Sequence, residues 1–227
     1  KVMDFCKEAN RAGLQIELHA IGDKAFDQAC RAIKAALDDY PREDHRHGII
    51  HDCLPTPEGI QICRDYHIQM PMQSAFIGWK QEPDDYLEHI LGHDRLEKLN
   101  PIKTFRDNGI MVSFGSDAPC TTPDPIAWMD RAVNNDNAGQ AVSVQDALRM
   151  CTYNGAWAAF DEQERGSLEA GKIADMAVLS ENPYTVPKDK LSGLRVERLY
   201  LGGKPYESCR ESILPMMLRG LTSRNKA

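Results

Sequence analysis

The feature that most limits the fold of this chain is a regular alternation of short apolar segments with longer amphipathic ones, from residue 13 to about residue 160. In the first short segment, residues 14–20, Ile16 and Leu18 fall on one side and polar residues on the other, which is typical of a strand. The segment that follows Asp23 places apolar residues at helical spacing with charged residues between them. Because parallel strands need a long crossover that is usually helical, this alternation predicts parallel βα units. We therefore expect an α/β fold.

Four strands are expected in this region, at residues 14–20, 48–53, 67–73 and 110–115. Helices are expected at residues 1–12, 23–37, 57–66, 95–108, 127–133 and 143–160. The long connection 74–94 is rich in acidic and aromatic residues, and its length favours a lid or a substrate-contacting segment over a simple turn. After residue 160, glycines punctuate short strand-like segments, so we expect a small β appendage. The predicted boundaries are 1–160 for the α/β part and 161–227 for the appendage with the C-terminal tail.

The composition limits the partners of the chain. A formal charge of -7 argues against general nucleic-acid binding, which requires clustered Lys and Arg. No apolar run approaches the roughly 20 residues that a membrane-spanning helix needs. The 7 cysteines are scattered without a paired motif, which predicts reduced thiols in a cytoplasmic protein. The partner expected from these features is a small molecule, with neither nucleic acid nor membrane.

Three residues of metal-binding type fall at the expected carboxyl ends of strands: His19, His51 and Asp117. Four βα units amount to half of an eight-stranded barrel, and in that fold the active residues stand at these strand ends. Side-chain alternation also places His19 and Asp117 on the inner side of their strands. Two imidazoles and one carboxylate suit a divalent metal such as zinc. The alternative is that each histidine is a hydrogen-bonded structural residue at the end of its strand.

Other candidate motifs in the sequence have weaker support. His45 and His47 imitate a two-histidine ligand pair, but they lie in a connection rich in Asp, Arg and Pro, so we expect a solvated loop. His89 and His93 have the spacing of a metalloprotease helix without the glutamate of that motif, and we expect them at the surface or in the lid. Ser116 lies in Gly-Ser-Asp, which differs from the Gly-x-Ser-x-Gly turn of an acylated serine.

Four stretches together resemble the amidohydrolase superfamily, specifically its amidohydrolase 3 branch, which includes N-substituted formamide deformylase-like proteins. They are LHAIGDKAFDQA around His19, HRHGIIHDCLPTPEGI around His51, FGSDAPCTTPDPI around Asp117 and, downstream, CTYNGAWAAFDEQERGSLEAGKIADMAVLSENP. The resemblance covers residues 1 to about 206, and its specificity lies in the combination and order of the four stretches.

The resemblance implies the C-terminal half of a metal-dependent (β/α)8 TIM barrel. His19 and His51 would match the histidines of the fifth and sixth strands, and Asp117 the aspartate of the eighth. These three residues would bind the metal, and Asp117 would also be the catalytic general base. Residues 166–183 resemble the family's β-sandwich segment. The implied activity is hydrolysis of a carbon-nitrogen bond in a non-peptide amide by metal-activated water.

The chain departs from the family pattern in two ways. Family members usually carry Glu before the histidine that corresponds to His51, whereas this chain has Ile50. The family's N-terminal half, with a His-x-His pair and a middle-strand ligand, has no counterpart here. We therefore expect a C-terminal fragment of a longer parent, and whether the isolated chain binds metal or is active stays open. Half a barrel leaves strand edges open at residues 14–20 and 110–115, which predicts association into a homodimer.

Two other functions remain open from the sequence. A non-catalytic domain that has lost the metal site would act by association with another chain. A barrel hydrolase that acts on esters would carry the same residues, because loops set the reaction class within this fold.

Overall fold

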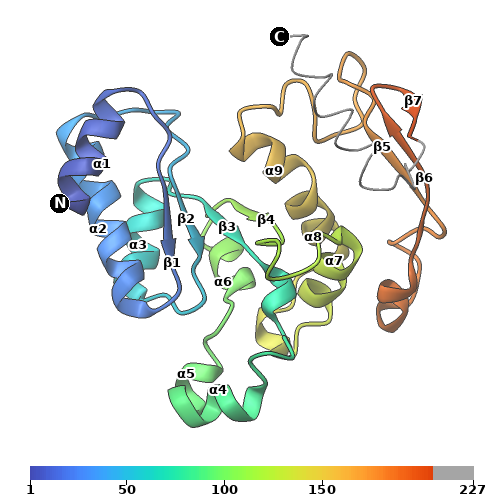
Figure 1. Ribbon diagram of the computed structural model, residues 1–227, viewed down its shortest axis with the longest axis horizontal. Coiled ribbons are helices and arrows are strands. Elements are labelled where there is room, and N and C mark those ends of the chain that lie inside the picture. The colour runs from blue at the N-terminus through green and yellow to red at the C-terminus, as the bar shows by residue number, and fades with distance from the viewer. Residues whose placement is uncertain (207–227) are drawn as a thin grey trace, which may run out of the picture.

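The computed structural model describes residues 1–206, so the expected C-terminal tail and Cys209 lie outside the described residues. Its secondary structure is mixed α/β, as expected (Figure 1). Four strands are parallel to their neighbours and follow each other in chain order: β1 (Glu17–Ala20), β2 (Gly48–His51), β3 (Met70–Met72) and β4 (Val112–Phe114). A parallel bridge between Gly48 and Gln69 joins the β1 and β2 pair to the β3 and β4 pair. The carboxyl ends of all four strands therefore face the same way.

One face of these strands packs against helices. In Figure 1 the helices beside β1 and β2 are α1 (Val2–Arg11), α2 (Asp23–Asp39) and α3 (Pro57–Asp65). Ile16 and Ile49 from the strand region are buried in one core with Phe26 of α2. Burial of each such side chain stabilises the fold by about 1.5–3 kcal/mol. α3 begins at Pro57 with Thr56 as its N-cap, a pair of start signals that the sequence shows directly.

The connection between β3 and β4 contains several short helices. They are the 3-10 turn η1 (Ser74–Phe76), α4 (Asp84–Leu91), α5 (His93–Leu96) and α6 (Ile102–Asp107). The expectation of one helix over residues 95–108 is wrong. Asn100 has a positive φ of 49°, and the residue after it is Pro101, which restricts the preceding backbone. The helical pattern is therefore divided into α5 and α6.

The chain after β4 is mainly helical up to Ala158. Its elements are α7 (Pro125–Val133), the 3-10 turn η2 (Ala138–Gln140), α8 (Val144–Cys151) and α9 (Tyr153–Ala158). α8 begins as expected, because the Ser143 hydroxyl accepts a hydrogen bond from the Asp146 N–H at 3.1 Å. The expectation of a continuous helix over residues 143–160 is wrong. Thr152 leaves the helical conformation, with φ -127° and ψ -89°, and separates α8 from α9.

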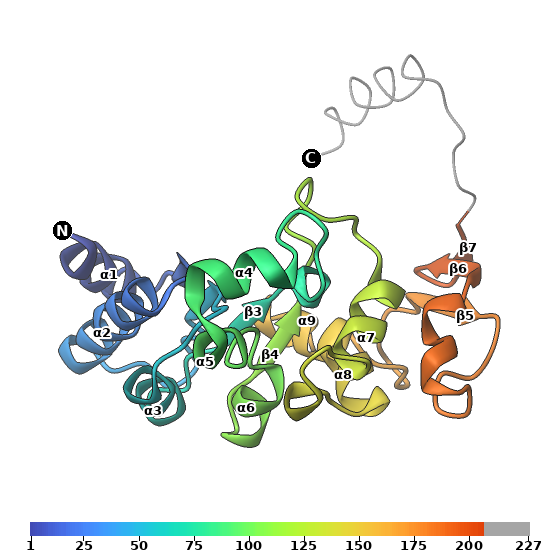
Figure 2. The same ribbon diagram turned by 90° about the horizontal axis from the view of Figure 1, so that it is seen from below.

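A separate antiparallel sheet follows the helices. It contains β5 (Met176–Leu179), β6 (Val196–Leu201) and β7 (Lys204–Pro205), with the 3-10 turn η3 (Lys188–Gly193) between β5 and β6. These strands lie in the region after residue 160 where short strands are expected, and the assignment of this region to a β-sandwich appendage stays a prediction. Figures 1 and 2 show it at the end of the molecule opposite α1. The predicted boundary between residues 160 and 161 stays a prediction.

Two expectations from composition also concern the described residues. Within residues 1–206, every helix is too short or too polar to cross a bilayer. The cysteines in the same range are all free, including Cys30 and Cys63, whose sulfur atoms lie 3.5 Å apart in the core. The redox state of these cysteines stays a prediction.

Candidate functional site

His19 and His51 lie side by side at the carboxyl ends of two paired strands. In the register of β1 and β2, His19 is opposite Ile50, and Ala20 is opposite His51. The centroids of the two imidazole rings are 4.5 Å apart, and the ring planes cross at 77°. His19 is exposed, whereas His51 is buried with 5% of its surface exposed. Strand pairing thus brings together two histidines that are far apart in the sequence.

Contacts from the region after β3 hold the ring of His51. Its Nδ1 atom lies 2.6 Å from Oε1 of Gln73. Phe76 stacks on the imidazole with ring centroids 5.9 Å apart, and Trp79 continues the stack at 5.1 Å from Phe76. His51 also has a positive φ of 76°, a strained conformation that is frequent at functional sites. The connection 74–94, which is expected to contact substrate, therefore contacts the ring of His51 near its start.

Asp117 lies in the turn after β4. Its side chain is exposed, its φ is 52°, and its carbonyl accepts a hydrogen bond from the Cys120 N–H at 2.8 Å. The Gly115 N–H donates to the Met72 carbonyl at 3.0 Å, and a Cβ on Gly115 would lie 3.9 Å from the carboxamide nitrogen of Gln73. Gln73 thus lies between the end of β2, where it contacts His51, and the end of the strand that leads to Asp117.

The three residues predicted to bind metal are not all in one cluster. Within residues 1–206, no three or more His, Cys, Asp or Glu side chains are close enough together to hold a metal ion. His19 and His51 contact each other, and Asp117 does not join them in such a group. Two imidazoles supply half of the four ligands that zinc usually takes. The pair therefore fits zinc by its donor chemistry, and a complete site needs further ligands.

The inner face of the strands is polar near the histidine pair. Glu17 lies two residues before His19, on the same side of β1, and its carboxylate accepts hydrogen bonds from the carboxamides of Gln69 at 3.0 Å and Gln15 at 3.3 Å. Part of the Glu17 side chain contacts solvent. Burial by the surrounding protein atoms raises its pKa to about 7, although the hydrogen bond from Gln69 lowers the pKa. Gly48 makes room for this carboxyl group, because a Cβ there would collide with it.

Asp52 is a buried acid that the sequence pattern did not single out. It directly follows His51 and has 0% exposure. Neither of its carboxyl oxygens has a hydrogen-bond partner within the described part of the chain. Burial raises the pKa of Asp52 well above its usual range, which favours the neutral acid. No local signal predicts this burial, since aspartate in such a position is usually at the surface.

The expectation of a solvated loop at His45 and His47 is wrong. The two side chains are buried, with 3% and 0% exposure. Nδ1 of His47 accepts from the Ile16 N–H at 3.1 Å, and its Nε2 donates to the Asn10 carboxamide oxygen at 3.0 Å. Nε2 of His45 lies 2.9 Å from the Tyr66 carbonyl. Burial lowers the pKa of His45 and lowers that of His47 to about 3, so both are neutral structural residues.

The remaining candidate motifs are at the surface. His89 and His93 are exposed, as expected, and the ring of His93 lies 3.3 Å from the carboxylate of Glu88. The Ser116 hydroxyl accepts from the Ala118 N–H at 3.2 Å and so supports the turn after β4. These contacts show no arrangement for metal binding or acyl transfer.

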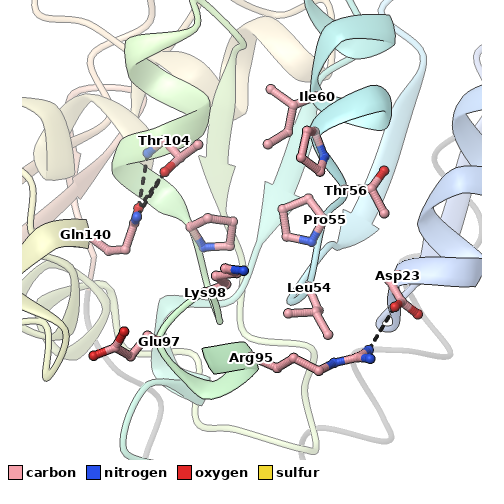
Figure 3. Close-up of a pocket in the computed structure, with 12 residues that line it drawn as sticks. Asp23, Leu54, Pro55, Thr56, Ile60, Arg95, Glu97, Lys98, Thr104 and Gln140 are labelled. Atoms are coloured by element: carbon pink, nitrogen blue, oxygen red, sulfur yellow. Dashed lines mark hydrogen bonds and ion pairs between the residues drawn. The ribbon is translucent and has the colours of Figure 1, made fainter. Parts of the chain in front are cut away.

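A cavity of about 340 Å³ lies apart from the histidine pair (Figure 3). Its walls come from the segments after β1 and β2 and from the segment around α5 and α6, and they include Pro55 and Pro101. At its edge, Arg95 donates to the Asp23 carboxylate at 2.8 Å. None of the three predicted metal-binding residues lines this cavity, so within the described residues it is distinct from the candidate site.

Similarity to known proteins agrees with the resemblance seen in the sequence. The model of the amidohydrolase family matches residues 1–206. N-substituted formamide deformylase from Arthrobacter pascens is 30% identical over 219 residues, which cover 89% of this chain and 38% of the deformylase. Protein LONG AFTER FAR-RED 3 from Arabidopsis thaliana is 29% identical over 213 residues, which cover 90% of this chain and 36% of that protein.

A solved structure shows the same fold. The crystal structure of an uncharacterized metal-dependent hydrolase from Pyrococcus furiosus matches with a TM-score of 0.69 at 26% identity, over 81% of this chain and 37% of that chain. This chain thus spans 36–38% of the length of these three proteins. The family match over residues 1–206 establishes that the chain belongs to the amidohydrolase family.

Proposed function

We propose that the protein to which this chain belongs is a metal-dependent amidohydrolase that cleaves carbon-nitrogen bonds in non-peptide amides. The observation that carries the proposal is the contact between His19 and His51 at neighbouring strand ends, in a chain of the amidohydrolase family. Active residues at the carboxyl ends of parallel strands are the arrangement of (β/α)8 enzymes. In this proposal β1 to β4 are the C-terminal half of such a barrel, residues 1–160, and residues 161–227 contain the β-sandwich segment and the tail.

His19, His51 and Asp117 would hold a divalent metal, and zinc suits the two imidazoles best. When bound, the metal would polarise the amide carbonyl and lower the pKa of water. The carboxylate of Asp117 would take a proton from the attacking water and return it to the leaving nitrogen. Phe76 covers one face of His51 and would exclude solvent from that side.

The first substrate class to test is the N-substituted formamides. The support for this choice is the name of the Arthrobacter relative, N-substituted formamide deformylase. The half-buried rings of Phe76 and Trp79 stack next to His51 and offer an apolar wall for the substituent on nitrogen. An ester hydrolase would use the same residues, so each formamide is compared with the corresponding formate ester.

The general-base role of Asp117 predicts a large loss of activity in the intact protein. Asp117→Asn should lower kcat by about 10²–10⁴-fold, because the amide cannot accept the proton. The measurement is steady-state turnover of formamide and ester, with Asp94→Asn, an exposed residue of α5, as the control. Unchanged turnover in Asp117→Asn would contradict the assignment, and turnover of the ester without turnover of the formamide by the unsubstituted protein would favour the esterase.

A second candidate function is non-catalytic association of a chain that has lost its metal site. It is favoured by the lack of a three-ligand group within residues 1–206. Elemental analysis after incubation with zinc separates the two functions, using the chain alone and the chain mixed with an N-terminal half of the family barrel. Stoichiometric zinc in the mixture supports the enzyme, and no zinc in either sample supports association.

The partners and location of the chain are also part of the proposal. For the chain on its own we propose a homodimer formed through strand edges, since β1 pairs only with β2 and β4 only with β3 within residues 1–206. A small-molecule substrate, without nucleic acid or membrane, is supported by the formal charge of -7. A cytoplasmic location is supported by the free cysteines of the described residues.

A further inference from the structure

Gln73 places a carboxamide group against His51 from the end of the neighbouring strand, β3. Its Oε1 lies 2.6 Å from Nδ1 of His51, and the two residues are buried with 7% and 5% exposure. Phe76 follows after a short turn, and its ring lies over the imidazole with 21° between the planes. One residue therefore binds the edge of the imidazole and the other covers its face.

The hydrogen bond between Gln73 and His51 determines where the imidazole proton lies. A carboxamide oxygen can only accept a hydrogen bond, so the Nδ1 atom that faces it must carry the proton. A neutral imidazole has one ring proton, so Nε2 keeps its lone pair. Within residues 1–206, Nε2 of His51 has no hydrogen-bond partner. The nitrogen that can bind a metal is thus the one that the protein leaves free.

We propose that Gln73 is a positioning residue that fixes His51 in the Nδ1–H tautomer and so presents Nε2 as the ligand atom. Metal-binding histidines usually donate their other ring N–H to an oxygen acceptor, which sets both the tautomer and the orientation of the ring. Gln73 supplies that acceptor without adding a negative charge beside the site. The inference rests on the proposed function only in naming a metal as the ligand, because the tautomer is a property of the metal-free chain.

The tautomer is tested by NMR on the full chain labelled with ¹⁵N-histidine. Long-range proton–nitrogen spectra distinguish protonated from unprotonated ring nitrogens, and His51→Gln identifies the signals of His51. We expect a protonated Nδ1 and an unprotonated Nε2 in the unsubstituted chain. Gln73→Leu should shift His51 toward the Nε2–H form, whereas Gln73→Glu should keep Nδ1–H because a carboxylate also accepts. The control is Gln140→Leu, a glutamine that pairs with Thr104.

Two NMR outcomes would overturn the inference. One is a protonated Nε2 together with an unprotonated Nδ1 in the unsubstituted chain, which would mean that Gln73 donates through its nitrogen. The other is an unchanged His51 signal in a folded Gln73→Leu variant. If Gln73→Leu does not fold, the comparison of Gln73→Glu with the unsubstituted chain replaces it, and loss of Nδ1–H in Gln73→Glu is then the contradicting result.

Zinc titration followed by calorimetry, on the chain mixed with an N-terminal half of the family barrel, tests the presentation of the ligand atom. Gln73→Leu should bind zinc about 10–100-fold more weakly than the unsubstituted chain, and Gln73→Glu should restore the affinity. Equal zinc affinity in Gln73→Leu would overturn the role of Gln73. A tautomer that responds to Gln73 while no variant binds zinc even in the mixture would instead count against the metal-dependent function and support the positioning of His51.

Discussion

Asp52 and His47 lie just outside the two ends of β2, and both are fully buried, with 0% exposure. They differ in hydrogen bonding. Both ring nitrogens of His47 have partners, whereas neither carboxyl oxygen of Asp52 has one within residues 1–206. An unpaired buried polar group costs about 1–3 kcal/mol, whereas a paired one contributes modestly to stability. At the scale of single residues, substitution of these two side chains should therefore change stability in opposite directions.

Asp52→Asn should raise the free energy of unfolding at pH 7.5 by about 1 kcal/mol or more, because an amide is neutral at every pH, whereas the buried acid must either carry a charge without a partner or take up a proton that the unfolded chain has released. Urea denaturation followed by circular dichroism measures the change. Asp65→Asn is the matched control, since Asp65 is exposed and hydrogen-bonded to Gln61. A less stable Asp52→Asn variant would show that the carboxyl group has a favourable partner.

His47 should make stability fall as the pH is lowered. Its pKa is about 3 in the folded state, because of burial, and about 6.5 in the unfolded state, so the unfolded chain takes up the proton first. The stabilisation is therefore present above pH 6.5 and is lost as the pH falls toward 3, at about 1.4 kcal/mol per pH unit.

The variant His47→Gln isolates this effect from other titrating groups. At pH 7.5 the variant should be less stable than the unsubstituted chain. The difference between their free energies of unfolding should decrease by up to about 2 kcal/mol at pH 5. Urea denaturation at several pH values measures both free energies of unfolding. A difference in free energy of unfolding that stays constant with pH would rule out a neutral His47 in the folded state.

At the scale of elements, Arg46 in the connection before β2 forms contacts with α9 and with the residues that follow α9. Its guanidinium donates to Glu162 at 2.8 and 2.9 Å and to Asp44 at 2.7 Å. The same group lies 4.6 Å from the ring centroid of Trp157 and 4.2 Å from that of Phe160. Arg46 and Glu162 are buried, with 8% and 9% exposure. This contact joins parts of the chain that are more than a hundred residues apart.

Arg46→Ala should destabilise the chain by about 3–5 kcal/mol, because it leaves the buried Glu162 without its partner. Arg46→Lys should recover only part of the loss, since an ammonium group cannot form the same paired hydrogen bonds. Arg11→Ala breaks the exposed pair with Asp39 and should cost about 1 kcal/mol or less. Thermal and urea denaturation measure the loss of stability in the three variants. Equal losses in Arg46→Ala and Arg11→Ala would refute the stabilising role of Arg46.

At the scale of the whole molecule, the parallel sheet is open at β1. Leu14 precedes this strand and Ile21 follows it, and they are exposed at 59% and 50%. An open strand edge flanked by apolar side chains is a surface suited to pairing with another chain. The proposed homodimer would cover this edge.

Leu14→Glu should weaken self-association of the chain about tenfold or more, because a charge would be buried at the interface. Sedimentation equilibrium over the micromolar range measures the dissociation constant. Tyr184→Glu is the control, because Tyr184 is similarly exposed, at 62%, and lies outside the strand region. A monomer throughout this range for the unsubstituted chain would contradict the homodimer.

Sequence patterns were sufficient to predict the mixed α/β fold, the positions of most strands and helices, and the placement of His19, His51 and Asp117 at or after strand ends. These features are local, because side-chain periodicity, N-caps and prolines act within a few residues. The division of the predicted helix 95–108 was also readable from Pro101, which ends a helix by its own geometry.

The contacts between side chains from different elements depend on the folded chain and were not predictable from sequence patterns. Strand pairing set the contact of His19 with His51, and packing from the next strand brought Gln73 to the same ring. His47 is hydrogen-bonded to Asn10 of α1 and to the Ile16 N–H, whereas the carboxyl oxygens of the buried Asp52 have no partner within residues 1–206. Burial and long-range hydrogen bonds depend on the packed chain as a whole, so no short window of sequence contains them.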